Sequence, residues 1–345
     1  MTLVDKIFNY ISSLYTKGRL LLSTFLFLFI SCKYNTNIEL KGITMGTTYS
    51  IIIHDGSSSL FKNKEIQIKV DSILYDINNI FSTYIDTSEI NKINNSFKDT
   101  IAISKHFMYV LNQSFNINKK TYEMFDPTIK PLIDLWNFNF SKVNFIPPKI
   151  GSIEKIMKNI GLNNISIKND LIIKKNNATL DFNAIAKGYA IDVIGNYFIS
   201  CGYKNFMIEI GGEVLCKGKN NNKTWSIGLQ NPFIQEDFFD IIFLNDKAIA
   251  TSGTYRNFYY YNDILYSHII NPKTGFPVSH NTVSVSVIAD NCLIADAYAT
   301  GLIVLGAEKG VELVDRIEGL EAVFILGDRD KYSFKFSKNY KNFIK

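Results

Sequence analysis

Two oxygen-bearing side chains near the C-terminus have a spacing that suits a divalent cation. Asp296 and Thr300 are four residues apart, inside a helix that the apolar pattern predicts over 293–304. Residues four apart share one helix face, so their oxygens converge on one point. Mg²⁺ accepts few protein oxygens when substrate phosphates complete its octahedron. An ordinary buried aspartate, satisfied by backbone N–H groups, is the alternative for Asp296.

A second polar group lies at the start of a predicted helix. Asp181 stands just before a helix expected over 184–200, and Lys187 lies on the first turns of that helix. A cation at a helix N-terminus could reach a bound diphosphate. A simple N-cap is an equally good interpretation of Asp181.

Two glycine-containing stretches have the composition of a phosphate or ribose site. Gly211 and Gly212 close a predicted strand, where their N–H groups could face a phosphate. The stretch 251–256, Thr-Ser-Gly-Thr-Tyr-Arg, combines small hydroxyl side chains with a cation. Ordinary turns and hairpin loops have the same composition, so neither stretch is specific by itself.

The N-terminus has the pattern of an export signal. Lys17 and Arg19 precede an apolar run over 20–30, and Ser31 and Cys32 follow it. The run is shorter than the roughly 20 residues that a membrane-spanning helix needs. A basic segment, a short apolar segment and a small residue before a cysteine resemble a bacterial lipobox, although Phe29 stands where leucine is usual.

From this pattern we expect a signal peptide over 1–31 and a lipid-modified Cys32 at the start of the mature chain. A tether over 32–40 would follow, and then one domain over 41–340. The protein would be exported and lipid-anchored to the bacterial cell membrane, facing the periplasm or the cell exterior. A buried N-terminal helix explains less well why no polar stripe interrupts the run.

Composition excludes several other classes of protein. The chain has 345 residues, 46% of them hydrophobic, so it can bury a large core and is not a disordered chain. Its 37 basic and 32 acidic residues give a net charge of +5 without a basic cluster, which argues against a nucleic-acid partner. The cysteines are far apart, so zinc and iron–sulfur sites are not expected.

The remaining pattern predicts an α+β fold. Helices are expected over 65–81, 105–121, 184–200, 293–304 and 308–317. A strand is expected over 43–54, a hairpin over 165–174 that turns at Asn169-Asp170, and a final pair of strands near the C-terminus. Further strands are expected over 206–210, 214–216, 225–229, 241–244, 248–251, 258–261, 264–270 and 283–289. Hairpin connections without strict strand–helix alternation favour α+β over a doubly wound sheet.

Taken together and in this order, the motifs resemble the ApbE family of FAD:protein FMN transferases. The resemblance covers nearly all of the chain after the signal. It is carried by the stretches 45–49, 82–94, 125–136, 181–192, 211–213, 251–256, 268–277 and 295–305. Small departures, Asn183 and Ala184 at variable positions and Asn271 where Asp often stands, affect fine geometry only.

The resemblance implies a T-fold-like architecture with mixed, largely antiparallel sheets and packed helices. It also implies Mg²⁺-dependent transfer of FMN from FAD to a Thr or Ser hydroxyl of a target protein, with release of AMP. By motif position, the flavin contacts would be Met45, Tyr84, Met124, Phe125, Asp126, Asp181, Lys187 and Ile270. The metal ligands would be the backbone oxygen of Ala184 and the side chains of Asp296 and Thr300.

The general base and the final acceptor are open to alternatives. His268 is the candidate base, because its ordinary pKa near 6.5 suits proton transfer at neutral pH; a purely structural histidine is about as good an interpretation. An FAD pyrophosphatase would use the same site with water as the nucleophile. A non-catalytic flavin-binding lipoprotein would lack the metal pair, whereas Asp296 and Thr300 are both present. The bulky Tyr84 leaves less room for the second metal that hydrolysis favours. By resemblance, the targets would be subunits of Na⁺-translocating quinone reductase or related electron-transport complexes.

Overall fold

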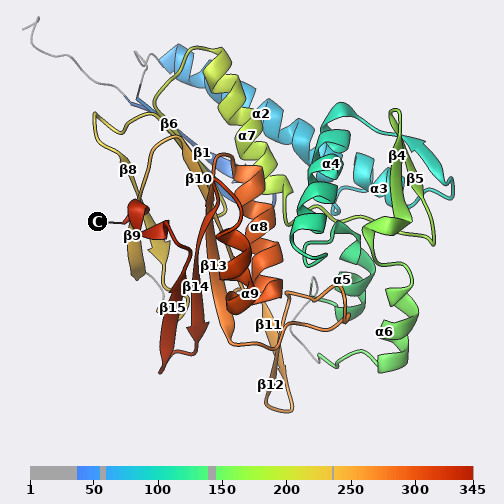
Figure 1. Ribbon diagram of the computed structural model, residues 1–345. Coiled ribbons are helices and arrows are strands. Elements are labelled where there is room, and N and C mark those ends of the chain that lie inside the picture. Colours follow the sequence, from blue (N-terminus) through green and yellow to red (C-terminus); the bar gives the residue numbers. More distant parts are fainter. Residues whose placement is uncertain (1–36, 55–59, 139–144, 235–236, 345) are drawn as a thin grey trace, which may run out of the picture.

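The computed structural model describes residues 37–54, 60–138, 145–234 and 237–344. One large sheet organises the fold, in the strand order β1-β2-β6-β7-β10-β13-β14-β15 (Figure 1). Every neighbouring pair in it is antiparallel. Its strands are β1 (Ile38–Thr44), β2 (Thr47–Ile53), β6 (Phe206–Ile210), β7 (Glu213–Lys217), β10 (Lys247–Gly253), β13 (Thr282–Ala289), β14 (Glu321–Gly327) and β15 (Tyr332–Phe336).

Four helices pack on this sheet. Helices α2 (Leu60–Phe81) and α7 (Ala186–Ser200) contact its β1–β7 half, whereas α8 (Cys292–Leu305) and α9 (Ala307–Val314) contact β10, β13 and β14 (Figure 1). Helix α8 is apolar almost all round, as expected for a helix that is covered on every side. Asp296 is its one charged residue, which makes that side chain the exception to be explained.

A second group of helices and a small sheet lie on the other side of α8, at the right of Figure 1. It contains α3 (Glu89–Asn94), α4 (Lys105–Lys120), α5 (Lys130–Trp136) and α6 (Ile150–Met157), with β3 (Thr100–Ala102), β4 (Ile165–Lys168) and β5 (Leu171–Lys174). The two groups meet at Gly301 of α8, where an added Cβ would lie 2.9 Å from the Thr121 side chain. The candidate site lies along this junction.

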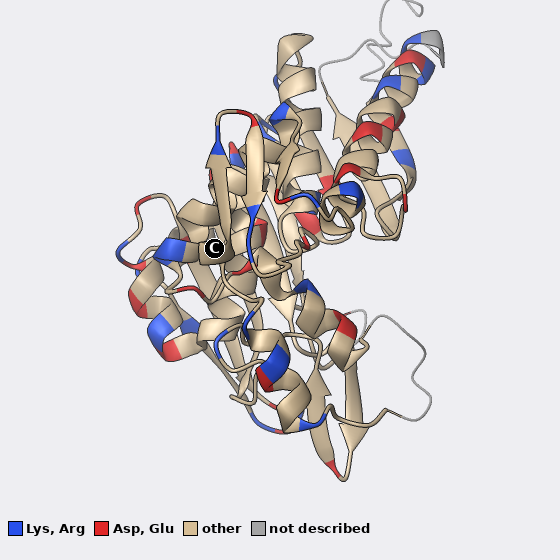
Figure 2. Cartoon of the chain, turned by 90° about the vertical axis from the view of Figure 1, so that its right-hand side faces the viewer, with Lys and Arg blue, Asp and Glu red and all other residues tan. Residues whose placement is uncertain are grey.

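Among the described residues, two further hairpins lie outside these sheets. One pairs β8 (Trp225–Gln230) with β9 (Phe238–Leu244), and the other pairs β11 (Phe258–Tyr261) with β12 (Ile264–Ser267). The mixture of antiparallel sheets and helices confirms the predicted α+β class. Lys and Arg are interspersed with Asp and Glu on the face shown in Figure 2.

Several predicted bounds differ from the structure. The strand expected over 43–54 is a hairpin, in which Met45 and Gly46 adopt positive φ between β1 and β2. Strand β1 begins at Ile38, inside the segment 32–40 assigned to the tether. The strand expected over 264–270 ends at Ser267, because the chain then turns into a loop held by a bridge between Ile270 and Pro277.

The hairpin over 165–174 is confirmed, with Asn169 in the left-handed region at its turn. In the part of the chain that the structure describes, no helix is both long enough and apolar enough to cross a membrane. Cys32 and the expected signal peptide lie outside the described residues.

Candidate active site

Two adjoining cavities gather the residues predicted to bind flavin and metal. The first has a volume of about 220 Å³ and is lined by every predicted flavin, metal and catalytic residue except Met45 and Tyr84. Those two residues line the second cavity, of about 310 Å³. The two cavities adjoin, because Asn183, Lys187 and Arg256 line both. Two positively charged residues, Lys187 and Arg256, thus lie at their junction.

The start of α7 places Lys187 at this junction. The helix begins at Ala186, with Ile185 at the N-cap position and no side-chain capping bond, so Asp181 is not its N-cap. The Asp181 carboxylate instead accepts hydrogen bonds from the backbone N–H of Asn183 at 2.7 Å and from its side-chain amide at 3.1 Å. Burial raises the pKa of Asp181.

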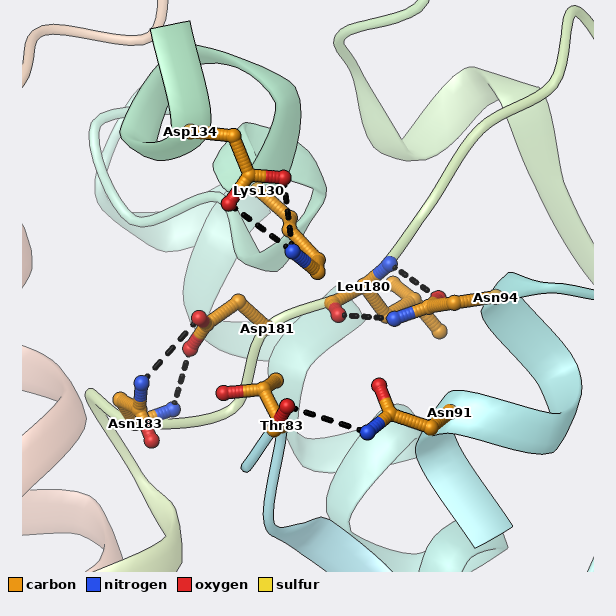
Figure 3. A network of polar contacts seen from close by, with 8 residues as sticks. All are labelled: Thr83, Asn91, Asn94, Lys130, Asp134, Leu180, Asp181 and Asn183. Carbon is orange, nitrogen blue, oxygen red and sulfur yellow. Dashed lines mark hydrogen bonds and ion pairs between the residues drawn. The ribbon is translucent and has the colours of Figure 1, made fainter. Parts of the chain in front are cut away.

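The short helix α3 holds two parts of the site in place. Asn94 makes two hydrogen bonds to the backbone of Leu180, at 2.7 and 2.8 Å, which fixes the chain just before Asp181. Asn91 donates to the backbone oxygen of Thr83, next to Tyr84. Figure 3 shows both contacts.

An ion pair on α5, between Lys130 and Asp134, lies above Asp181 in Figure 3. Lys130 Nζ lies 2.7 Å from the nearer oxygen of Asp134, its partner one turn later in the helix. Both charges act on Asp181, the lysine lowering its pKa and the aspartate raising it, and burial outweighs them.

Tyr84 is 72% exposed at the rim of the second cavity.

Helices α7 and α8 are in backbone contact, which brings the two predicted motifs together. The backbone N–H of Gly188 donates to Asp296 Oδ2 at 3.0 Å. Four residues later, the Asp192 carboxylate accepts the N–H groups of Cys292 and Leu293 at 2.8 and 2.9 Å. Helix N-termini carry unpaired N–H groups and a positive partial charge, so Asp192 stabilises the start of α8. Burial, partly offset by these hydrogen bonds, raises the pKa of Asp192 to about 6.

A cluster of three charges lines the first cavity. Lys187 Nζ lies 3.3 Å from Glu213 Oε1, and Asp296 is also close enough to influence both groups electrostatically. Burial alone would lower the pKa of Lys187, but the Glu213 and Asp296 carboxylates outweigh it and raise that pKa. Burial raises the pKa of both Glu213 and Asp296, and Lys187 partly opposes that rise.

The predicted metal ligands occupy one wall of the first cavity. Asp296 is 4% exposed, and its Oδ2 accepts the backbone N–H of Gly188. Thr300 Oγ1 lies 3.1 Å from Ser252 Oγ on β10. Across the described part of the chain, no group of three or more His, Cys, Asp or Glu side chains is placed to hold a metal ion.

This donor set nevertheless suits Mg²⁺. One carboxylate, one hydroxyl and one backbone oxygen leave positions for water and for substrate phosphates, which is how this ion binds in phosphate chemistry. Glu213 Oε2, in the same cavity, is buried and has no hydrogen-bond partner among the described residues. The residues Ala184, Asp296 and Thr300 therefore fit the ion.

His268 lines the same cavity in a defined tautomer. Its Nδ1 lies 2.9 Å from the backbone oxygen of Asn257, which can only accept, so Nδ1 carries the hydrogen. Burial and the nearby cations Arg256 and Lys187 lower the pKa of His268. The imidazole is thus neutral at pH 7, and Nε2 is the nitrogen that can accept a proton.

The segment 124–126 forms another wall. It follows two residues, Tyr122 and Glu123, in the left-handed region, which is uncommon for side chains of this kind. Asp126 Oδ1 accepts the N–H and the hydroxyl of Thr128, at 2.8 and 2.6 Å, at the start of a short 3₁₀ helix (Pro127–Ile129). Burial raises the pKa of Asp126 to about 6.

Three residues of the site were not among the predicted contacts. Glu213 and Arg256 belong to motifs that the sequence singled out, 211–213 and 251–256, but no role was assigned to their side chains. Asp192 closes the motif 181–192, and an acidic residue within α7 gave no sign that it would cap α8. The composition of these motifs was the available signal, whereas the partners become visible only in the fold.

Comparison with known proteins places this site in a family. The ApbE family model matches residues 45–324. The FAD:protein FMN transferase of Vibrio cholerae is 32% identical over 311 residues, covering 89% of this chain and 92% of the relative. That of Buchnera aphidicola is 35% identical over 315 residues, covering 89% and 91%.

Solved structures give the same result. The flavin transferase ApbE of Vibrio cholerae matches with a TM-score of 0.81 at 31% identity, covering 90% of this chain and 99% of that structure. The ApbE protein of Thermotoga maritima matches with a TM-score of 0.80 at 27% identity, covering 90% and 100%. The family model spans most of the chain, and the relatives align along nearly their whole length. The chain therefore belongs to the ApbE family.

Proposed function

We propose that this protein transfers FMN from FAD to a Thr or Ser hydroxyl of an acceptor protein in an Mg²⁺-dependent reaction that releases AMP. One observation carries the proposal. Lys187 at the start of α7 and the pair Asp296 and Thr300 on α8 line the first cavity. The expected flavin contacts line this cavity and the adjoining one. The FAD:protein FMN transferase relatives support the same activity.

The reaction exchanges the phosphoanhydride bond of FAD for a phosphate ester bond to the acceptor. The acceptor oxygen attacks the phosphorus of the FMN half of FAD and forms a new P–O bond. The bond from that phosphorus to the bridging oxygen breaks, and the bridging oxygen leaves with AMP. The hydroxyl proton passes to a base on the enzyme.

His268 is suited to take that proton. Its Nδ1–H is held by the backbone oxygen of Asn257, and the lowered pKa keeps Nε2 unprotonated at neutral pH. The lowered pKa also makes His268 a weaker base than a free histidine, so positioning must supply much of its effect.

Lys187 and Arg256 contribute positive charge where the diphosphate would lie, because both line both cavities. Ala184, Asp296 and Thr300 would hold Mg²⁺, which neutralises charge on phosphate oxygens when it is bound. Asp192 and Gly188 keep α8, and with it Asp296, against α7. These residues would thus bind the diphosphate, orient it and neutralise its charge, which is most of what phosphoryl transfer requires.

We also propose that the protein is exported and anchored through a lipid on Cys32, as the N-terminal pattern indicates. Its acceptors would then be flavoproteins of the same membrane, such as subunits of Na⁺-translocating quinone reductase or related electron-transport complexes. This part of the proposal rests on the sequence pattern and the family resemblance.

The deciding experiment incubates the full chain with FAD, Mg²⁺ and a candidate acceptor protein, and then separates the products by denaturing electrophoresis. Flavin fluorescence that stays with the acceptor band, with AMP in solution, supports the transferase. Free FMN and AMP without labelled acceptor would identify an FAD pyrophosphatase. FAD that is bound but unchanged would identify a non-catalytic flavin-binding protein.

A further inference from the structure

The buried carboxylate of Glu213 has no role in the reaction described above. Its side chain lines the first cavity, and the residue is 3% exposed. Oε1 faces Lys187 Nζ at 3.3 Å, whereas Oε2 has no hydrogen-bond partner among the described residues. A buried carboxylate with an unsatisfied oxygen weakens a fold. Stability therefore does not explain its presence.

The position of Glu213 is rigid. It is the first residue of β7, directly after Gly211 and Gly212, whose positive φ values of 62° and 100° turn the chain from β6 into β7. Strand β7 is paired on both sides, with β6 and β10, and α7 packs against it. The sheet thus fixes the Glu213 carboxylate against the second residue of α7, which is Lys187.

Two carboxylates compete for the ammonium group of Lys187. Both Glu213 and Asp296 attract its ammonium group, and both raise its pKa. An ion pair with Asp296 would occupy the predicted metal ligand and draw the ammonium away from the junction of the cavities. In the structure the ammonium lies within 4 Å of Glu213 and 3.5 Å from the backbone oxygen of Asn183.

We infer that Glu213 is a positioning residue, which holds the Lys187 ammonium at the junction of the two cavities and away from Asp296, where it contacts the diphosphate of FAD. The inference rests on the proposed function, because FAD is the ligand that this ammonium would contact. It assigns Glu213 no contact with the substrate. Its effect on FAD binding passes entirely through Lys187.

Positioning and simple charge predict opposite changes in FAD affinity. Glu213→Met removes a negative charge near the site together with the acceptor that holds Lys187. If the charge alone mattered, the anionic diphosphate would bind more tightly to the variant. If Glu213 positions Lys187, FAD binds more weakly by about tenfold, the usual effect of losing one charged hydrogen bond.

The measurement is FAD binding by the full-length chain, followed by flavin fluorescence with a chelator present so that metal does not contribute. Glu213→Gln keeps an acceptor oxygen for the ammonium and should lose less affinity than Glu213→Met. In a Lys187→Met background, Glu213→Met should cause no further loss of FAD affinity, because Glu213 acts on FAD only through Lys187. Glu308→Gln, which removes an exposed carboxylate paired with Lys335, is the control and should bind FAD normally.

Thermal unfolding separates positioning from folding. Glu213→Gln keeps an acceptor oxygen for Lys187 and should leave the thermal midpoint nearly unchanged. Glu213→Met leaves the Lys187 ammonium with one carboxylate fewer and should lower the midpoint, so Glu213→Gln serves if the Met variant does not fold. Unchanged or tighter FAD binding by the variants, or a further loss in the Lys187→Met background, overturns the inference and leaves the transferase function standing. A wild-type chain that does not bind FAD overturns both.

Discussion

Gly188 on α7 and Cys292 on α8 are in close backbone contact, next in sequence to Lys187 of the site. A Cβ built on Gly188 would lie 2.4 Å from the carbonyl oxygen of Cys292, a distance that real side chains do not reach. The same glycine donates its N–H to Asp296. The distance between Lys187 on α7 and Asp296 on α8 therefore depends on glycine, which has no side chain, at position 188.

Gly188→Ala should force α7 and α8 apart. Alanine favours a helix by about 1 kcal/mol over glycine, but overpacking against backbone costs about 1–3 kcal/mol, so the free energy of unfolding should fall by up to about 2 kcal/mol. Mg²⁺ affinity should fall as well, because Asp296 moves with α8. Gly151→Ala is the matched control: it lies in helix α6 with no atom within 4 Å of the new Cβ, so chemical denaturation should find it neutral or stabilised. Equal effects at the two positions would contradict the close-contact explanation.

Asp192→Asn should weaken the contact between α7 and α8 at the N-terminus of α8. The amide can accept only one of the two N–H groups that the carboxylate accepts, and it carries no charge to offset the helix dipole. We expect a loss of about 1–3 kcal/mol in the free energy of unfolding at pH 7. Asn291→Ala removes the ordinary N-cap of the same helix and gives a reference of about 1 kcal/mol. A smaller loss in Asp192→Asn than in Asn291→Ala would show that Asp192 is not the main cap.

Features of the site that depend on short sequence spacing could be predicted. Asp296 and Thr300 lie on one helix, and Lys187 lies on the first turn of another, as the sequence indicated. The alternative interpretation of Asp296, a carboxylate satisfied by backbone N–H groups, is also partly correct, because Asp296 accepts a hydrogen bond from the Gly188 N–H. Both interpretations apply to the same side chain, because Asp296 accepts a backbone N–H and also lines the first cavity.

Features that depend on distant contacts could not be predicted. Helix α3 has only six residues, too few for a periodic pattern, and its Asn94 binds the backbone of Leu180, 86 residues away. Glu213 meets Lys187 only because β7 and α7 pack together. Such partners follow from topology, whereas propensity and periodicity report on a few neighbouring residues.

Cys32→Ser should release the protein from the membrane. The predicted lipoprotein carries several acyl chains on this residue, and multiple chains anchor stably where a single chain is marginal. The variant should appear in the soluble exported fraction, measured by immunoblot after a carbonate wash. Cys201→Ser, at an exposed cysteine in the folded part, is the control and should stay with the membrane. Sedimentation of both variants with membranes would show that another segment anchors the protein.

The pH dependence of transfer should reflect the lowered pKa of His268. Because burial and nearby cations disfavour the imidazolium, the neutral base persists below the ordinary value of 6.5, and kcat/KM should fall only at more acidic pH. His268→Gln should lose about 10²- to 10⁴-fold in kcat and the acidic limb due to this group. His54→Gln, at a histidine stacked on Trp225, should keep the wild-type profile. An unchanged rate in His268→Gln would make this histidine structural and leave the base to be found elsewhere.

The two predicted metal ligands on α8 should differ in how they respond to Mg²⁺. Asp296→Asn keeps the shape of the side chain but removes the charge that offsets the ion, so Mg²⁺ affinity should fall far more than FAD affinity measured without metal. Thr300→Val removes a neutral ligand with little change in volume, so its defect should be smaller and partly rescued by raising Mg²⁺. Flavinylation rate against Mg²⁺ concentration, paired with thermal unfolding of each variant without Mg²⁺, tests both expectations. Because burial already raises the pKa of Asp296, the neutral Asn should fold well. A large loss of stability with an unchanged Mg²⁺ dependence would mean that Asp296 holds α8 against Gly188 and that the metal binds elsewhere.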